Sequence, residues 1–346
     1  MKKLAVGVGT LLLAAVVIAV AGQRQIGGLL VDRMIESRIG VDPIAALPDG
    51  LHVKVCGSGS PLPDPGRAGP CLYVVAGDQT FVVDAGSSSA RTMMGQQLPL
   101  GRLNGVFLTH FHSDHIDGLG ELMLQRWAQG NNTSPLPVYG PDGVTQVVNG
   151  LNTAYNLDSG YRTAHHGADI MPPSGNGGVP ISFALTEGQP TEVFNAGGLT
   201  VFATSVDHSP VKPAVAYRFN YKGQSIVISG DANPDSGLET FAAGADILFH
   251  EALSRELVSK IETAAKTANR PELSKIMFDI QDYHTSPEEA ARIAEAAGAK
   301  ALVLYHIVPA LPVSYLKATF LGDAKDYYSG DLIIAEDGML FSLLAK

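Results

Sequence analysis

The residues with the clearest chemistry lie in one short stretch, His110-Phe111-His112-Ser113-Asp114-His115. It holds three histidines and one aspartate in the pattern H-x-H-x-D-H. Imidazole and carboxylate groups together bind zinc and its neighbours in the first transition series. The first two histidines, two positions apart, would project from the same side of an extended segment, whereas the aspartate and the third histidine would turn toward a second point. The spacing therefore favours two adjacent metal ions over one.

Apolar strands would have to position this cluster. Residues 105–108 form an apolar run directly before it, and a stretch with helical apolar periodicity begins at Ile116. Other ligand-type residues also follow apolar runs directly, and they are His208, Asp231, His250, Glu251 and His306. One such residue would mean little, because polar groups often terminate strands. Several of them together with the cluster predict a single site at one rim of a sheet.

The sequence pattern predicts short strands and helices separated by turns in the rest of the chain. We predict strands at residues 51–56, 71–75, 80–83 and 103–109, and helices at 116–129 and 143–155. Residues 158–178 are rich in glycine and proline and show no clear element. Strands return from residue 181, and Ser286-Pro287-Glu288-Glu289 has the form of a capping box that opens a helix ending near Gly298. Strand runs at both ends, each followed by helices, predict two sheets packed face to face with helices outside.

The N-terminal segment differs from the remainder. Lys2 and Lys3 precede an uncharged apolar run from Leu4 to Ala21, which ends in a small-x-small pattern. Residues 1–22 are therefore expected to be either a cleaved signal peptide or a retained membrane anchor. Residues 23–49 would form a connecting arm and residues 50–346 one catalytic domain. The domain would be periplasmic or secreted, or anchored to the inner membrane by residues 4–21.

Charge and cysteine content narrow the class of partner and the compartment. The net charge of −10 repels polyanions, so a nucleic-acid partner is not expected. The two cysteines, Cys56 and Cys71, lie in neighbouring predicted strands. They would form either a disulfide, which an exported domain permits, or two buried free thiols; we favour the disulfide. The sequence makes no prediction of an oligomeric state.

The arrangement of these motifs resembles the metallo-β-lactamase superfamily. The resemblance rests on the H-x-H-x-D-H cluster, His208, Ser229-Gly230-Asp231 and His306, and it covers about residues 50–345. Val83-Asp84-Ala85-Gly86 also fits the opening strands of that family. The resemblance implies an α/β (α+β) fold, the four-layer αββα sandwich of the metallo-β-lactamase fold.

Two further motifs resemble a narrower branch of the superfamily. His250-Glu251-Ala252 with His284-Thr285-Ser286 is similar to the branch that holds tRNA 3′-processing endonucleases and zinc-dependent arylsulfatases. The segments at residues 206–213 and 124–127 look closest to the arylsulfatase-like group. Within this branch, the resemblance implies two Zn²⁺ ions, with Mn²⁺ or Fe also accepted by such ligands.

The same resemblance implies roles for individual residues. One metal would be bound by His110, His112 and His208, the second by Asp114, His115 and His306, and Asp231 would bridge both. Asp84 and Asp207 would orient ligand histidines from behind. A metal-bridging hydroxide would be the nucleophile, with Asp114 among the catalytic residues. His284, held by Glu251, would donate a proton to the leaving group. Substrate contacts are expected from Arg67, Trp127 and Lys212.

These expectations favour an exported, metal-dependent hydrolase of small anionic sulfate or phosphate esters. The alternative is a tRNA 3′-processing phosphodiesterase, that is, an endoribonuclease. Residues 142–200, where such nucleases carry the arm that grips tRNA, contain one arginine, Arg162, and no lysine against five carboxylates. A lactonase and a β-lactamase also stay open, although β-lactamases lack a bridging aspartate such as Asp231.

Overall fold

The computed structural model describes residues 19–20, 22–186, 188–234 and 237–346. The chain divides into two compact units, residues 1–45 and 46–346. In the first unit, helix α2 (Gln23–Arg38) has no buried residue. Within the described ranges, no helix is long and apolar enough to cross a membrane. The predicted signal peptide or anchor at residues 4–21 lies almost wholly outside the described residues.

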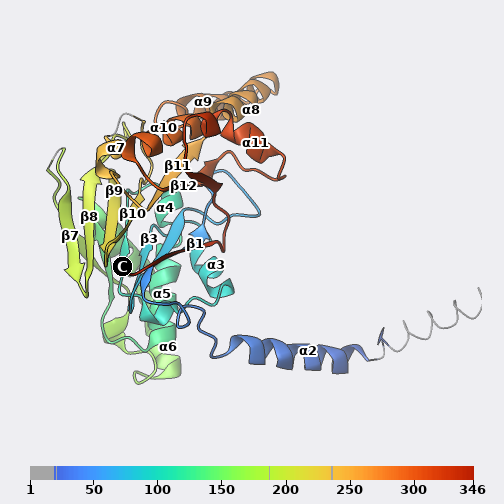
Figure 1. Cartoon of the computed structure of the whole chain (residues 1–346). Helices are drawn as coiled ribbons and strands as arrows, with labels where there is room; N and C mark the ends of the chain where they lie inside the picture. The colour runs from blue at the N-terminus through green and yellow to red at the C-terminus, as the bar shows by residue number, and fades with distance from the viewer. Residues whose placement is uncertain (1–18, 21, 187, 235–236) are drawn as a thin grey trace, which may run out of the picture. The chain divides into compact units, whose positions relative to one another are not determined.

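The second unit contains two seven-stranded sheets (Figure 1). The first has the strand order β14-β1-β2-β3-β4-β5-β6, antiparallel from β14 to β3 and parallel from β3 to β6. Its strands are β1 (Gly50–Gly57), β2 (Cys71–Ala76), β3 (Gln79–Val83), β4 (Gly105–Phe107), β5 (Leu136–Gly140), β6 (Gly178–Ser182) and β14 (Leu340–Leu344). The disulfide prediction is confirmed, because Cys56 of β1 is bonded to Cys71 of β2.

The second sheet has the order β13-β12-β11-β10-β9-β8-β7. Its strands are β7 (Thr191–Ala196), β8 (Leu199–Ser205), β9 (Val215–Tyr221), β10 (Gln224–Ile228), β11 (Ile247–Leu253), β12 (Ala301–Val308) and β13 (Asp331–Ile334). Strands β10 to β13 run parallel to one another. Their carboxyl ends therefore meet along one rim.

An aromatic core joins the two sheets. Phe107 of β4 is fully buried, and its ring centroid lies 5.4 Å from that of Phe81, 5.3 Å from that of Tyr217 and 5.4 Å from that of Phe219. Phe81 belongs to the first sheet, whereas the other two belong to β9 of the second. Each buried aromatic side chain removes a large apolar surface from water, and this burial stabilises the packing of the two sheets.

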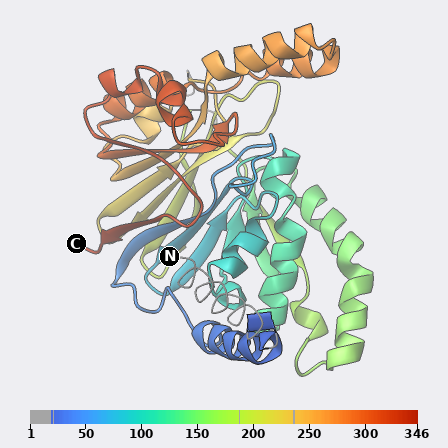
Figure 2. The ribbon, with the colours of Figure 1, turned by 90° about the vertical axis from the view of Figure 1, so that its right-hand side faces the viewer.

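Helices cover the outer faces of both sheets (Figures 1 and 2). On the first sheet these are α3 (Ser89–Gly95), α5 (Leu119–Gly130) and α6 (Val144–His166), with the short α4 (Ser113–Ile116) at the rim. The second sheet carries α7 (Leu238–Phe241), α10 (Pro287–Ala297) and α11 (Leu316–Leu321), and a hairpin of α8 (Arg255–Thr267) and α9 (Pro271–Asp279) follows β11. The predicted four-layer αββα sandwich is thus the observed fold.

The structure confirms one local prediction and corrects another. The capping box is confirmed, since the side chain of Ser286 accepts from the backbone N–H of Glu289, and α10 ends at Ala297 with Gly298 as its C-cap. The irregular stretch predicted at residues 158–178 is wrong in its first part, because α6 continues to His166. Gly160 costs a helix only about 1 kcal/mol relative to alanine, so it lowers helix propensity without ending the helix. His165 and His166 occupy the last turn of α6 and are exposed.

Candidate metal centre

The seven expected ligand residues come from separate elements and meet at one rim. His110 and His112 lie in the loop after β4, while Asp114 and His115 belong to α4. The remaining three, His208, Asp231 and His306, come from the second sheet, after β8, after β10 and within β12. All except His112 are buried. The close pairing of the sheets therefore brings ligands together that are far apart in the chain.

These residues form overlapping groups with the geometry of metal sites. In each group, one potential ligand atom per residue lies within 4.8 Å of the others. The first group contains His110, His112, His208 and Asp231. The second contains Asp114, His115 and His306, and the third contains Asp231, His284 and His306. The first two groups match the expected division of ligands between two metals.

Asp231 occupies the position between the two groups. Its Oδ2 lies 3.7 Å from His110 Nε2 and 3.8 Å from His208 Nε2, both in the first group. Its Oδ1 lies 3.4 Å from His115 Nε2 in the second group. Its Oδ2 also lies 3.4 Å from His306 Nε2 in the second group, so this carboxylate could help to hold a metal at either group.

A bulge in the second sheet directs His306 into the centre. In the pairing of β11 with β12, Glu251 opposes Tyr305 and Ala252 opposes Ile307, so His306 is an extra residue. Its φ of 48° lies in the left-handed region, which non-glycine residues rarely adopt. Bulges re-aim side chains, and such backbone strain concentrates at functional sites. His306 Nε2 thereby comes within 3.2 Å of Asp114 Oδ2.

A second layer of hydrogen bonds holds the histidines in place. Asp84, itself at a φ of 56°, accepts from the backbone N–H and the hydroxyl of Thr109, and its Oδ2 lies 2.9 Å from His115 Nδ1. His208 Nδ1 lies 2.9 Å from the carbonyl oxygen of Tyr283. Both contacts leave Nε2 free to bind a metal. Asp207 accepts from the backbone N–H and the hydroxyl of Ser209 in a turn, and its orienting role stays a prediction.

The charges of the cluster set the protonation state of each candidate ligand. Burial alone would raise the pKa of Asp231, but the histidines His306 and His115 outweigh burial and hold that pKa well below its usual range. Burial alone would lower the pKa of His115, but Asp231 and Asp84 raise it well above the usual value. Burial lowers the pKa of His110 well below its usual value and keeps this imidazole neutral, the form that binds metals.

Unpartnered buried atoms test whether metals fit this centre. Among the described residues, His115 Nε2 and Asp231 Oδ1 are buried and have no hydrogen-bond partner. Leaving buried polar atoms without a partner costs about 1–3 kcal/mol each. The two atoms face each other at 3.4 Å, and a cation between them would satisfy both. The nitrogen and oxygen donor set thus fits first-row metal ions, zinc included.

His284 and Glu251 form a pair beside the centre. His284 Nδ1 lies 3.2 Å from Glu251 Oε2, and both side chains are buried. The other carboxylate oxygen of Glu251 accepts from the backbone N–H of Thr285, at 2.7 Å. His284 also belongs to the group with Asp231 and His306. The structure therefore places it where it can reach a group bound at the metals.

The residues predicted to contact substrate have different environments. Trp127 is fully buried and its indole N–H donates to the carbonyl of Pro172, so the predicted substrate contact is wrong, because this side chain packs inside the fold. Lys212 is exposed after β8, and its role stays a prediction. Arg67 lines a pocket that also includes Asp114. Neither the chain position of Trp127 nor its type could distinguish packing from binding.

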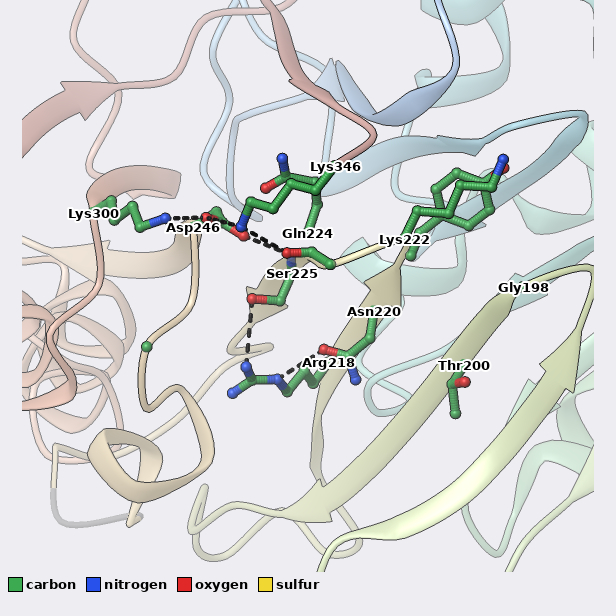
Figure 3. Close-up of a pocket in the computed structure, with 13 residues that line it drawn as sticks. Gly198, Thr200, Arg218, Asn220, Lys222, Gln224, Ser225, Asp246, Lys300 and Lys346 are labelled. Carbon is green, nitrogen blue, oxygen red and sulfur yellow. Dashed lines mark hydrogen bonds and ion pairs between the residues drawn. The ribbon is translucent and has the colours of Figure 1, made fainter.

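A separate cationic pocket lies at the other end of the second sheet (Figure 3). It encloses about 420 Å³ and is lined by Arg218, Lys222, Lys300 and Lys346, with Asp246 as the carboxylate among them. Lys300 precedes β12, whereas His306 lies near the end of that strand. The lysines are partly neutralised, since Lys300 pairs with Asp246 at 2.6 Å. This pocket takes no part in the metal centre.

The sandwich of two sheets, with a histidine–aspartate cluster at the strand ends, defines a hydrolase of the metallo-β-lactamase fold. Comparison with known families agrees, because the model of the beta-lactamase superfamily domain matches residues 79–307. The chain belongs to this superfamily.

Known relatives narrow the resemblance further. The chain is 36% identical over 263 residues to "Ribonuclease Z" of Mycolicibacterium paratuberculosis, and the matched region covers 75% of this chain and 87% of that protein. It is 37% identical to "Ribonuclease Z" of Mycobacterium bovis BCG Pasteur, with the same coverage. Among solved structures, the metallo-β-lactamase fold protein YhfI from Bacillus subtilis has a TM-score of 0.61 at 24% identity, covering 85% of this chain and 100% of that one. The short form of human tRNase Z has a TM-score of 0.59 at 22% identity, covering 84% and 98%.

These relatives correct two expectations. The predicted hydrolase of small sulfate or phosphate esters is wrong, and so is the prediction that nucleic acid is no partner, because the relatives are named ribonucleases. The finer likeness to arylsulfatases is not supported either. The charge argument failed because net charge describes the whole surface, whereas a substrate meets only a part of it.

Proposed function

We propose that the protein is a metal-dependent phosphodiesterase of the ribonuclease Z type that cleaves RNA, with 3′ processing of tRNA as the reaction. The observation that carries this proposal is 36–37% identity to ribonuclease Z proteins over three quarters of the chain. The seven converging ligand-type residues and the His284–Glu251 pair support it, since phosphodiester hydrolysis needs a nucleophile, charge neutralisation and a proton donor.

The proposed chemistry divides between the metals and the side chains. When bound, two zinc ions would make hydroxide available near neutral pH and neutralise the charge that develops on the phosphate. A water molecule gives one proton to solvent, and the resulting hydroxide attacks phosphorus. The bond from phosphorus to the leaving ribose oxygen breaks, His284 donates a proton to that oxygen, and His284 regains a proton from solvent. Glu251 lies 3.2 Å from His284 Nδ1 and accepts from the backbone N–H of Thr285 with its other oxygen, so it would hold the imidazole in place.

A cleavage assay tests this function directly. Zinc-loaded full-length protein is incubated with a tRNA precursor carrying a 3′ trailer, and the cleavage site is mapped, beside Asp231→Ala as an inactive control. We expect cut RNA with the wild type and none with the variant. Uncut RNA, with hydrolysis of p-nitrophenyl sulfate or nitrocefin instead, would contradict the proposal.

The compartment is a separate proposal. We propose export, on the basis of the apolar run at residues 4–21 and the Cys56–Cys71 disulfide, because disulfides persist mainly in oxidising compartments. Fractionation of cells that express the full chain, followed by immunoblotting, tests this. Recovery of the protein in the cytoplasm with free thiols would contradict export. Recovery outside the cytoplasm would separate the protein from tRNA precursors, so cleavage of RNA would stand as its reaction but 3′ processing of tRNA would not.

A further inference from the structure

The strand that carries His306 is held from the other sheet. Directly after His306, the backbone N–H of Ile307 donates to the carbonyl oxygen of Ser58 at 3.0 Å. Ser58 follows β1 of the first sheet, whereas Ile307 belongs to β12 of the second. Both residues are buried. This hydrogen bond therefore connects the two sheets at the position next to a candidate metal ligand.

One carboxylate fixes Ser58 in turn. Asp337 lies in the connection between β13 and β14, and its Oδ1 accepts from the backbone N–H of Ser58 at 2.9 Å and from the hydroxyl of Ser58 at 2.8 Å. Its Oδ2 accepts from the backbone N–H of Ala68 at 2.7 Å, at the far end of the loop that Ser58 begins. Hydrogen bonds to a carboxylate are roughly twice as strong as those between neutral groups. Asp337 therefore ties both ends of this loop to the segment that links the two sheets.

The conformation of His306 makes this support important. His306 is the extra residue of the bulge in β12, and its φ of 48° lies in the left-handed region. Backbone of this kind persists only where the surrounding structure fixes it. Before the bulge, Tyr305 pairs with Glu251 of β11, and after the bulge the N–H of Ile307 bonds to Ser58. Loss of the contact from Ser58 would leave a buried N–H unpaired and would let His306 turn away from the centre.

The other end of the same loop meets a further ligand of the same group. Gly69 follows Ala68, and a Cβ placed at Gly69 would lie 3.0 Å from the carbonyl oxygen of Asp114. Asp114 and His306 both belong to the second ligand group. The histidines of the first group come from the loop after β4 and from the segment after β8. Both oxygens of the Asp337 carboxylate therefore support the second ligand group.

We propose that Asp337 is a positioning residue of the metal centre, which holds His306 and Asp114 at the spacing that a shared metal ion requires. It acts through the backbone of Ser58 and Ala68 and binds no metal itself. The inference rests on the proposed function, because that reaction uses two metals, and it adds a carboxylate from outside the ligand set. Replacement of residues behind metal ligands commonly weakens metal binding, so the role can be measured.

Metal binding by the full chain tests this role without reference to catalysis. Metal-free protein is titrated with Zn²⁺ in competition with a chromophoric chelator. We expect two ions to bind the wild type, and one of them to bind Asp337→Ala about 10–100-fold more weakly. Asp337→Asn keeps an acceptor oxygen for Ser58 and should recover part of that affinity. If Asp337→Ala does not fold, Asp337→Asn carries the test, since loss of the bond to Ala68 should still weaken one ion.

Asp246→Ala is the matched control. Asp246 is also buried and accepts from a backbone N–H, that of Ser225 at 2.8 Å. It directly precedes β11, at the end of the second sheet away from the metal centre. The control should therefore bind both ions as the wild type does.

A second measurement reports on the backbone in the absence of metal. A hydrogen bond protects an amide from exchange with solvent. The amide of Ile307 should therefore exchange its hydrogen for deuterium faster in metal-free Asp337→Ala than in the metal-free wild type, as mass spectrometry of peptides would show. The rate in Asp246→Ala should be unchanged.

The possible outcomes distinguish the positioning role from the reaction. Equal affinity of wild type and Asp337→Ala for both ions, an equal loss at both ions, or the same selective loss in Asp246→Ala overturns the role. If the wild type binds one ion, the two-metal centre is wrong, and exchange at Ile307 decides the role: faster exchange in Asp337→Ala keeps it and unchanged exchange overturns it. A wild type that binds both ions as expected but cuts no RNA overturns the proposed reaction and leaves the role of Asp337 in place.

Discussion

At the scale of single residues, the clearest feature is the pairing of His284 with Glu251 beside the ligand groups. A protonated imidazole matters most when the leaving oxygen is a poor leaving group. We expect His284→Ala to lower kcat on RNA by about 10²–10⁴-fold, but to change hydrolysis of bis-p-nitrophenyl phosphate much less. The exposed His165→Ala at the end of α6 is the control. Equal losses on both substrates would show that His284 serves the centre in another way, for example as a ligand.

Metal binding should depend on pH through two of the histidines. Nearby carboxylates raise the pKa of His115 and of His306 above the ordinary value of 6.5, although burial opposes this. Both must lose a proton before they bind a metal, so affinity should rise as pH increases through the neutral range. Burial lowers the pKa of His110 and of His208, so these two imidazoles are already neutral and release no proton when a metal binds. Calorimetry at pH 7 in buffers of different ionisation enthalpy should show proton release, and buffer-independent heats would contradict this.

At the scale of elements, close backbone contacts hold the loops that carry the ligands. A Cβ placed at Gly86 would lie 2.2 Å from the carbonyl oxygen of Asp114, a distance that backbone atoms cannot accept. Gly86→Ala should therefore displace α4, lowering both Tm and metal content. Gly95→Ala in α3 is the matched control, since nothing lies within 4 Å of its Cβ position. Metal content measured by atomic absorption should fall only in Gly86→Ala. An equal metal content in the two variants would contradict the proposed effect of the close contact at Gly86.

At the scale of the whole molecule, the disulfide fastens the first two strands of the sandwich. Cys56 and Cys71 close a loop of 15 residues, which corresponds to about 3 kcal/mol in the chain-entropy model. Replacement of both cysteines by serine should lower the free energy of unfolding in guanidinium chloride by about that amount. Reduction of the wild type should reproduce the loss. An unchanged midpoint in both experiments would show that the sandwich gains nothing from the bond.

Much of the fold and of the centre could be predicted from the sequence, for one physical reason. Ligand-type residues that directly follow apolar strands, such as His208 and Asp231, must lie at a rim, because a strand buried in a sandwich ends where its apolar run ends. The period of the apolar residues and the capping box at Ser286 predicted the elements in the same way. These features are local, so the chain displays them without its tertiary structure.

Only the tertiary structure decided how these residues act together. The bulge that turns His306 inward depends on pairing with β11, and the burial of Trp127 depends on the segment around Pro172. The pocket beside Asp114 arises where the loop at residues 60–67 meets α4. Such features result from contacts between distant segments, and residue type alone does not specify them. The sequence by itself thus determined the sandwich and the candidate metal ligands, whereas packing between distant segments decided the geometry of these ligands and the shape of the site.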